Sequence, residues 1–119
     1  AIAWEILASF VLVLVTLIQT GPKTATSQVN VWNAVSICGT YAIMYLQSSV
    51  WTGGSVNPAY GTTYTLVDLF DTGEDQAIEF IWVYLLLPFI GAVAAWAAFQ
   101  FVYLPAAEEA DEDVVEKVH

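Results

Sequence analysis

Three long apolar stretches divide the chain, and polar segments separate them. They cover about residues 1–19, 31–48 and 78–104. Each approaches the roughly 20 residues that an α-helix needs to cross the hydrocarbon core of a bilayer. The pattern therefore predicts an all-α integral, multi-pass membrane protein with three transmembrane helices in residues 1–107, followed by a polar tail in residues 108–119.

The stretch between the second and third spans has an unusual pattern. Residues 24–67 carry no charge, yet glycine, serine and proline interrupt them. Residues 52–61 read TGGSVNPAYG; Asn57 as N-cap and Pro58 in the first helical position predict a helix start. About 13 further residues at 1.5 Å each cover roughly half a bilayer. We therefore expect a re-entrant loop and half-helix over about residues 50–70, with the helix starting at mid-membrane.

A break of this kind has a functional consequence. Non-helical backbone at membrane depth is tolerated only where it is buried in protein or lines a water-filled cavity. The half-helix also directs the positive end of its dipole at the middle of the membrane. The pattern thus predicts a pathway or a binding site at the re-entrant segment.

Charge is confined to a loop, a tail and a few single positions. The chain has twelve acidic residues against Lys23 and Lys117, and ten of the acids lie within residues 68–75 and 108–116. Nucleic-acid binding is excluded because almost nothing could neutralise phosphates. With three crossings, the loop carrying Lys23 and the tail lie on the same side, which the positive-inside rule predicts to be cytosolic.

The inventory of reactive side chains is small. Cys38 is the one cysteine, and His119 is the one histidine and the last residue. An internal disulfide, a histidine- or cysteine-based metal site and histidine acid/base chemistry are therefore excluded, and we expect neither a cofactor nor an enzyme. Cys38 lies in an apolar run and is expected to be a small core residue.

The sequence TGGSVNPA resembles the second NPA motif of the aquaporin (major intrinsic protein) family. The flanking segments are similar to the family's fourth, fifth and sixth membrane helices: WEILASFVLVLVTL, WNAVSICGTYAIMYL and WVYLLLPFIGAVAAW. The resemblance covers nearly all of the chain but half of the family's fold. It implies the C-terminal half-repeat, with three transmembrane helices and one re-entrant half-helix.

The resemblance assigns roles to particular residues. Asn57 would offer its side-chain amide to passing water, while Pro58 and Ala59 would pack the half-helix tips together. Glu5 matches the buried glutamate of the fourth helix, which braces the loop backbone; a direct part in transport is the alternative. A ladder of backbone carbonyls would accept hydrogen bonds from the water, contributed by Gly53, Gly54, Ser55 and Val56.

The implied function is passive transport of water or small neutral solutes. A half-repeat cannot enclose a pore alone, so the resemblance implies an N-terminal aquaporin-like half, in the same gene product or in a separate chain. It also implies a homo-tetramer or a subunit of a membrane complex within the lipid bilayer.

Two positions depart from the family pattern. The family has arginine directly after this motif, where the chain has Tyr60, and the constriction position of the fifth helix corresponds to Tyr45. Loss of arginine removes a cationic barrier and a fork of hydrogen-bond donors. The two tyrosines either line the passage or serve as bulky packing residues. A second hypothesis therefore stays open: a non-conducting, aquaporin-like structural subunit of a larger membrane complex.

Overall fold

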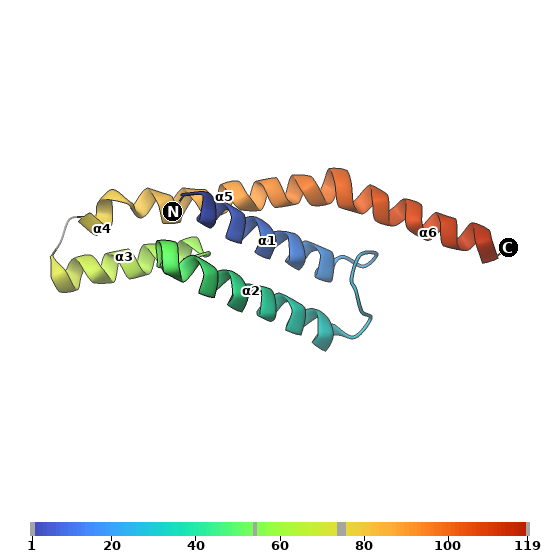
Figure 1. Ribbon diagram of the computed structural model, residues 1–119, viewed down its shortest axis with the longest axis horizontal. Helices are drawn as coiled ribbons and strands as arrows, with labels where there is room; N and C mark the ends of the chain where they lie inside the picture. The colour runs from blue at the N-terminus through green and yellow to red at the C-terminus, as the bar shows by residue number, and fades with distance from the viewer. Residues whose placement is uncertain (1, 54, 74–75, 119) are drawn as a thin grey trace.

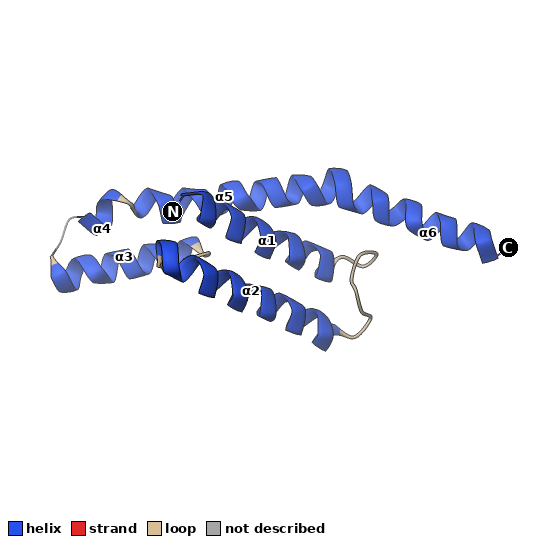
Figure 2. Ribbon diagram, in the orientation of Figure 1, coloured by secondary structure: helices blue, strands red, loops and turns tan. Residues whose placement is uncertain are grey.

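The computed structural model describes residues 2–53, 55–73 and 76–118, and within these ranges every regular element is a helix (Figure 2). The predicted all-α class is confirmed. In chain order the helices are α1 (Ile2–Thr20), α2 (Asn30–Thr52), α3 (Pro58–Thr72), α4 (Gln76–Glu79), α5 (Ile81–Ala98), the π-helix η1 (Phe99–Tyr103) and α6 (Leu104–Val118).

The helices form an elongated bundle with extents of 70 × 27 × 19 Å. Helix α1 packs against both α2 and α5, and α3 packs against α5. Figure 1 shows that α3 begins beside the end of α2 and points away from the α1–α2 loop. The non-helical residues 55–57 therefore lie at a joint inside the body of the bundle and not at one of its ends.

Within the described ranges, two helical segments are long and apolar enough to cross a membrane, namely Ile2–Thr20 and Ile81–Glu112. Helix α2 has 23 residues and rises about 34 Å at 1.5 Å per residue, which is sufficient length. Its composition is more polar, so the crossing predicted over residues 31–48 rests on its length and on the neighbouring spans.

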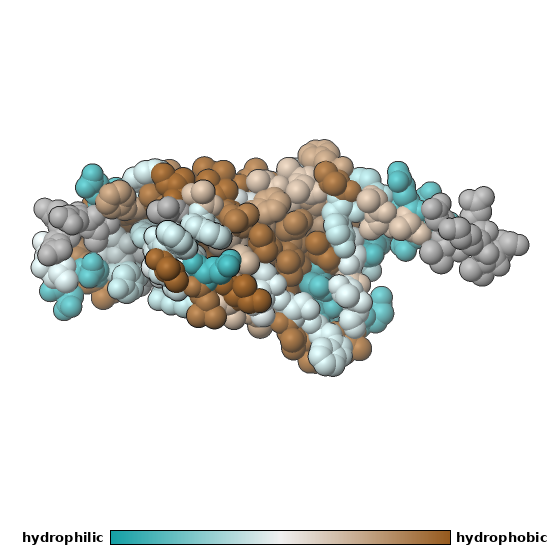
Figure 3. Space-filling model, in the orientation of Figure 1, coloured by the Kyte–Doolittle hydropathy of each residue, from teal (hydrophilic) through white to brown (hydrophobic). Residues whose placement is uncertain are grey.

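Burial in this chain is inverted relative to a water-soluble protein. The buried side chains include many polar ones, namely Glu5, Ser9, Thr24, Asn33, Ser48, Thr52, Ser55 and Thr65. Large apolar side chains are exposed instead, and Phe70 reaches 84% exposure. Figure 3 shows this apolar surface over the middle of the molecule. Polar groups inside and apolar groups outside are expected of helices that face lipid.

The same inversion overturns the prediction for Cys38. Its side chain is exposed. Helix α2 buries Asn33, Ser48 and Thr52, and turns its apolar residues outward. Apolarity in this helix therefore marks an outer face, and the prediction of a core cysteine was wrong.

Helix α2 ends later than the pattern predicts. The predicted span ends at residue 48, yet the helix continues, and the hydroxyls of Ser48 and Ser49 donate to the carbonyls of Tyr45 and Leu46. Each serine thus satisfies its hydroxyl inside the helix. The helix stops at Thr52 because Gly53 adopts a left-handed conformation with φ 81°, which a glycine does at low cost.

The third predicted span continues beyond residue 104. The N–H of Leu104 bonds to the carbonyl of Phe99, five residues earlier, in the wide turn of η1. Pro105 has no N–H to give, and such a wide turn is one way in which a helix accommodates a proline. The acidic tail is therefore a helix that continues the third span.

Candidate functional site

The joint between α2 and α3 ends at Asn57, and α3 begins with Pro58 and Ala59. Asn57 caps α3: its Oδ1 accepts the N–H of Ala59 at 2.9 Å, and Pro58 occupies the first turn. The helix start predicted from Asn57 and Pro58 is confirmed. Gly54, predicted to contribute a carbonyl, lies outside the described residues.

Val56 holds the backbone of the joint in a rare conformation. Its φ is 49°, and a β-branched residue in the left-handed region is a genuine outlier. Such a conformation costs on the order of 1–3 kcal/mol and persists where surrounding contacts enforce it. Here the valine is buried, and its N–H donates to Oε2 of Glu5 at 3.1 Å.

Glu5 reaches this joint from α1 and is fully buried. Its Oε1 accepts the hydroxyl of Thr52 at 2.5 Å, while its Oε2 accepts the Val56 N–H. One side chain therefore ties the end of α2 to the strained residue before Asn57, which is the geometry of a brace.

The carbonyls of the joint are partly used within it. The carbonyl of Ser55 accepts the N–H of Asn57. The carbonyl of Asn57 accepts both the Ser55 hydroxyl and the N–H of Gly61, each at 3.0 Å. Each carbonyl oxygen has two lone pairs. The carbonyl oxygen of Ser55 therefore has one lone pair left for a further hydrogen-bond donor.

The two tyrosines predicted from the departures come together. The rings of Tyr45 and Tyr60 meet edge to face with centroids 6.3 Å apart. Tyr41 stacks on Tyr45 at 6.4 Å, and Tyr64 stacks on Tyr60 at 6.5 Å. These four residues form a tyrosine row that crosses from α2 to α3.

Tyr41 and Tyr64 were missed by sequence reasoning. Tyr41 lies four residues before Tyr45 on α2, and Tyr64 lies four residues after Tyr60 on α3. A spacing of four residues places two side chains on the same face of a helix. That spacing was the available signal.

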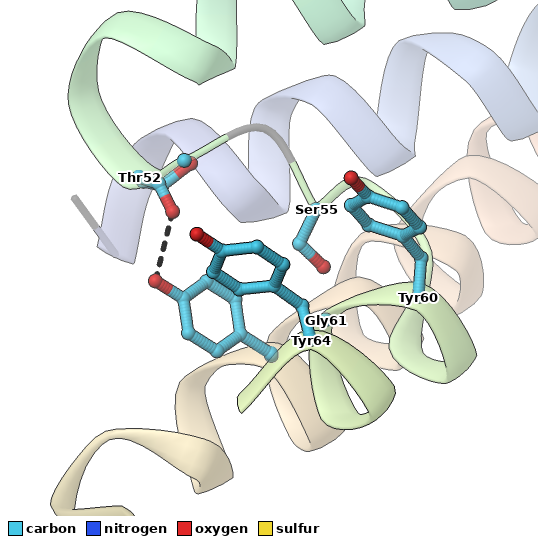
Figure 4. A pocket seen from close by; sticks show the side chains of 7 residues that line it. Thr52, Ser55, Tyr60, Gly61 and Tyr64 are labelled. Atoms are coloured by element: carbon cyan, nitrogen blue, oxygen red, sulfur yellow. Dashed lines mark hydrogen bonds between the residues drawn. The ribbon is translucent and has the colours of Figure 1, made fainter. Parts of the chain in front are cut away.

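A pocket of about 130 Å³ lies at the joint (Figure 4). Its lining is aromatic and hydroxyl-bearing, and none of the described lining residues carries a charge. The lining consists of Thr52, Gly53, Ser55, Tyr60, Gly61, Tyr64 and Tyr84. Gly61 and Tyr84 were not predicted as site residues. A pocket of this kind suits a small uncharged molecule that forms hydrogen bonds.

Comparison with known families identifies the family of the chain. The model of the family described as Major intrinsic protein matches residues 1–101. The chain belongs to the major intrinsic protein family. No curated protein and no solved structure matches it significantly.

Members of the major intrinsic protein family are channels in membranes and not enzymes, which gives this chain its general class. The matched residues of this major intrinsic protein include α1 to α5 and the whole joint. The match ends inside η1. The acidic helix α6 therefore lies outside the region that carries the family resemblance.

Proposed function

We propose that this major intrinsic protein passes water or small neutral solutes passively, along a path that follows the joint and the tyrosine row. The observation that carries the proposal is the cap geometry of Asn57. Its Oδ1 is taken by the N–H of Ala59, and the side chain is exposed. The amide NH₂ is the remaining donor group, and it suits a passing water at the start of α3.

The electrostatics of the joint support exclusion of cations. The N-terminus of α3 begins there, and a helix N-terminus carries roughly half a positive charge. A water chain held by fixed donors and acceptors and crossed by a positive potential passes water but opposes protons. Because Tyr60 is neutral where the family has arginine, this barrier depends on the helix end.

We also propose that the chain acts as the C-terminal half of the channel. Asn57, Ala59 and Tyr60 are exposed in this half. An N-terminal aquaporin-like half, from the same gene product or another chain, would cover this face and close the path. The complete channel would assemble as a homo-tetramer or within a membrane complex, with α6 in the cytosol.

A non-conducting structural subunit is the second candidate. The contact between the rings of Tyr45 and Tyr60 favours it, because it joins α2 to α3 beside the pocket. Such a contact blocks the path if it persists in the assembled protein.

Swelling of proteoliposomes distinguishes the two candidates. A channel gives osmotic water flux above that of empty vesicles, whereas flux equal to that of empty vesicles supports the structural subunit.

In a conducting protein, Asn57→Asp keeps the cap but loses the amide donor, so we expect altered proton exclusion or solute selectivity. Asn30→Asp, at the far end of α2, is the matched control. An unchanged profile in Asn57→Asp contradicts the placement of Asn57 on the path.

A further inference from the structure

Tyr84 reaches the joint from α5. Its hydroxyl donates to the carbonyl of Thr52 at 2.8 Å, shown by the dashed line in Figure 4. The last four carbonyls of a helix have no partner within the helix, and lipid cannot supply one. The Tyr84 hydroxyl therefore satisfies the carbonyl of the last residue of α2.

The Cβ of Tyr84 also lies against the other side of the joint. A Cβ placed on Gly61 would lie 2.7 Å from the Cβ of Tyr84 and 3.0 Å from that of Ser55. The first distance is shorter than real Cβ contacts and the second is very tight, so α3 approaches α5 this closely because residue 61 is glycine. Tyr84 thus binds the end of α2 with its hydroxyl and packs against α3 with its side chain.

We propose that Tyr84 is a positioning residue of the channel, which together with Glu5 holds Gly53 and residues 55–57 in the conformation required for conduction. Glu5 holds the loop from α1, and Tyr84 holds it from α5. Helices α1 and α5 pack directly on each other. Glu5 and Tyr84 therefore hold the joint from one packed helix pair. The proposal rests on the proposed function, because the part being positioned is the path of the solute.

Transport selectivity provides the first test. Tyr84→Phe removes one hydroxyl and leaves the ring in place. We expect the ratio of glycerol to water permeability in proteoliposomes to change by about fivefold, the equilibrium effect of losing one ordinary hydrogen bond. This ratio does not depend on how much protein is incorporated. Tyr103→Phe, on the same continuous helix but stacked on Phe99, is the control and keeps the wild-type ratio. A wild-type ratio in Tyr84→Phe overturns the proposal.

Hydrogen exchange provides a test that does not require conduction. We expect the Val56 amide to exchange about fivefold faster in Tyr84→Phe and at the wild-type rate in Tyr103→Phe. If wild-type vesicles show no flux, the proposed function fails, while the exchange rate still decides the role of Tyr84. Unchanged exchange in Tyr84→Phe overturns the proposal.

Discussion

At the scale of single residues, a buried carboxylate enforces a conformation that the local sequence disfavours. Glu5 accepts hydrogen bonds from Thr52 and Val56, and Val56 has φ 49°. We expect Glu5→Gln to lower the free energy of unfolding by roughly 2–3 kcal/mol, because the amide offers one oxygen where two acceptors are needed. Thermal unfolding in detergent measures this loss. Glu109→Gln, on the exposed acidic helix, is the control, and equal stability of the two variants would contradict the brace.

Asn57 allows structural and functional roles to be separated. Its Oδ1 caps α3, whereas its NH₂ is the donor assigned to the path. We expect Asn57→Ala to lose the cap and about 1 kcal/mol of stability. Asn57→Asp keeps an accepting oxygen, so its stability should stay near that of the wild type while its transport changes. Parallel unfolding and flux measurements test this; equal unfolding of the two variants would show that the cap is not stabilising.

At the scale of helices, the contact between α1 and α5 depends on a glycine. A Cβ on Gly91 would collide with the carbonyl oxygen of Ile6 and would lie 2.9 Å from the nitrogen of Phe10. We expect Gly91→Ala to destabilise the protein by about 1–3 kcal/mol through overpacking. At Gly39 a Cβ meets nothing within 4 Å, so Gly39→Ala should gain roughly 0.5–1 kcal/mol from helix propensity. Chemical unfolding of both variants tests the difference, and losses of similar size would contradict the close approach.

The sequence predicts helices better than it predicts their contacts. Apolar length and cap chemistry place the helices and the start of α3, because these are local properties. The end of α2 and the continuation through Pro105 were missed. The first depends on serine hydroxyls that bond to carbonyls of their own helix, and the second on a wide helical turn that accommodates the proline. Tyr84 was missed for another reason: its partner lies 32 residues away, and nothing in the sequence shows which tyrosine hydroxyl meets the joint.

At the scale of the whole molecule, one ion pair joins the α1–α2 loop to the acidic helix. Lys23 Nζ lies 2.8 Å from Glu108 Oε1, and both side chains are substantially exposed. The hydrogen bond that Lys23 donates to Glu108, followed by the negative charge of Glu108, raises the pKa of Lys23 above the ordinary 10.5. A raised lysine pKa means that the stabilisation is fully present below pH 10.5 and is lost as pH rises through the higher value. Lys23 therefore stays charged across the physiological range, and because the pair is exposed it contributes little to stability.

This link gives a prediction that the pKa of Lys23 itself can test. Asp111 and Glu112 also raise that pKa, but less than Glu108 does. Glu108→Gln should therefore return the pKa of Lys23 most of the way towards 10.5, and Asp111→Asn should lower it only slightly. Titration of the isotope-labelled lysine side chain by NMR measures both. Because the pair is exposed, salt should reduce the difference. Equal pKa changes in the two variants would show that the summed negative charge of α6, and not the specific pair with Glu108, raises the pKa of Lys23.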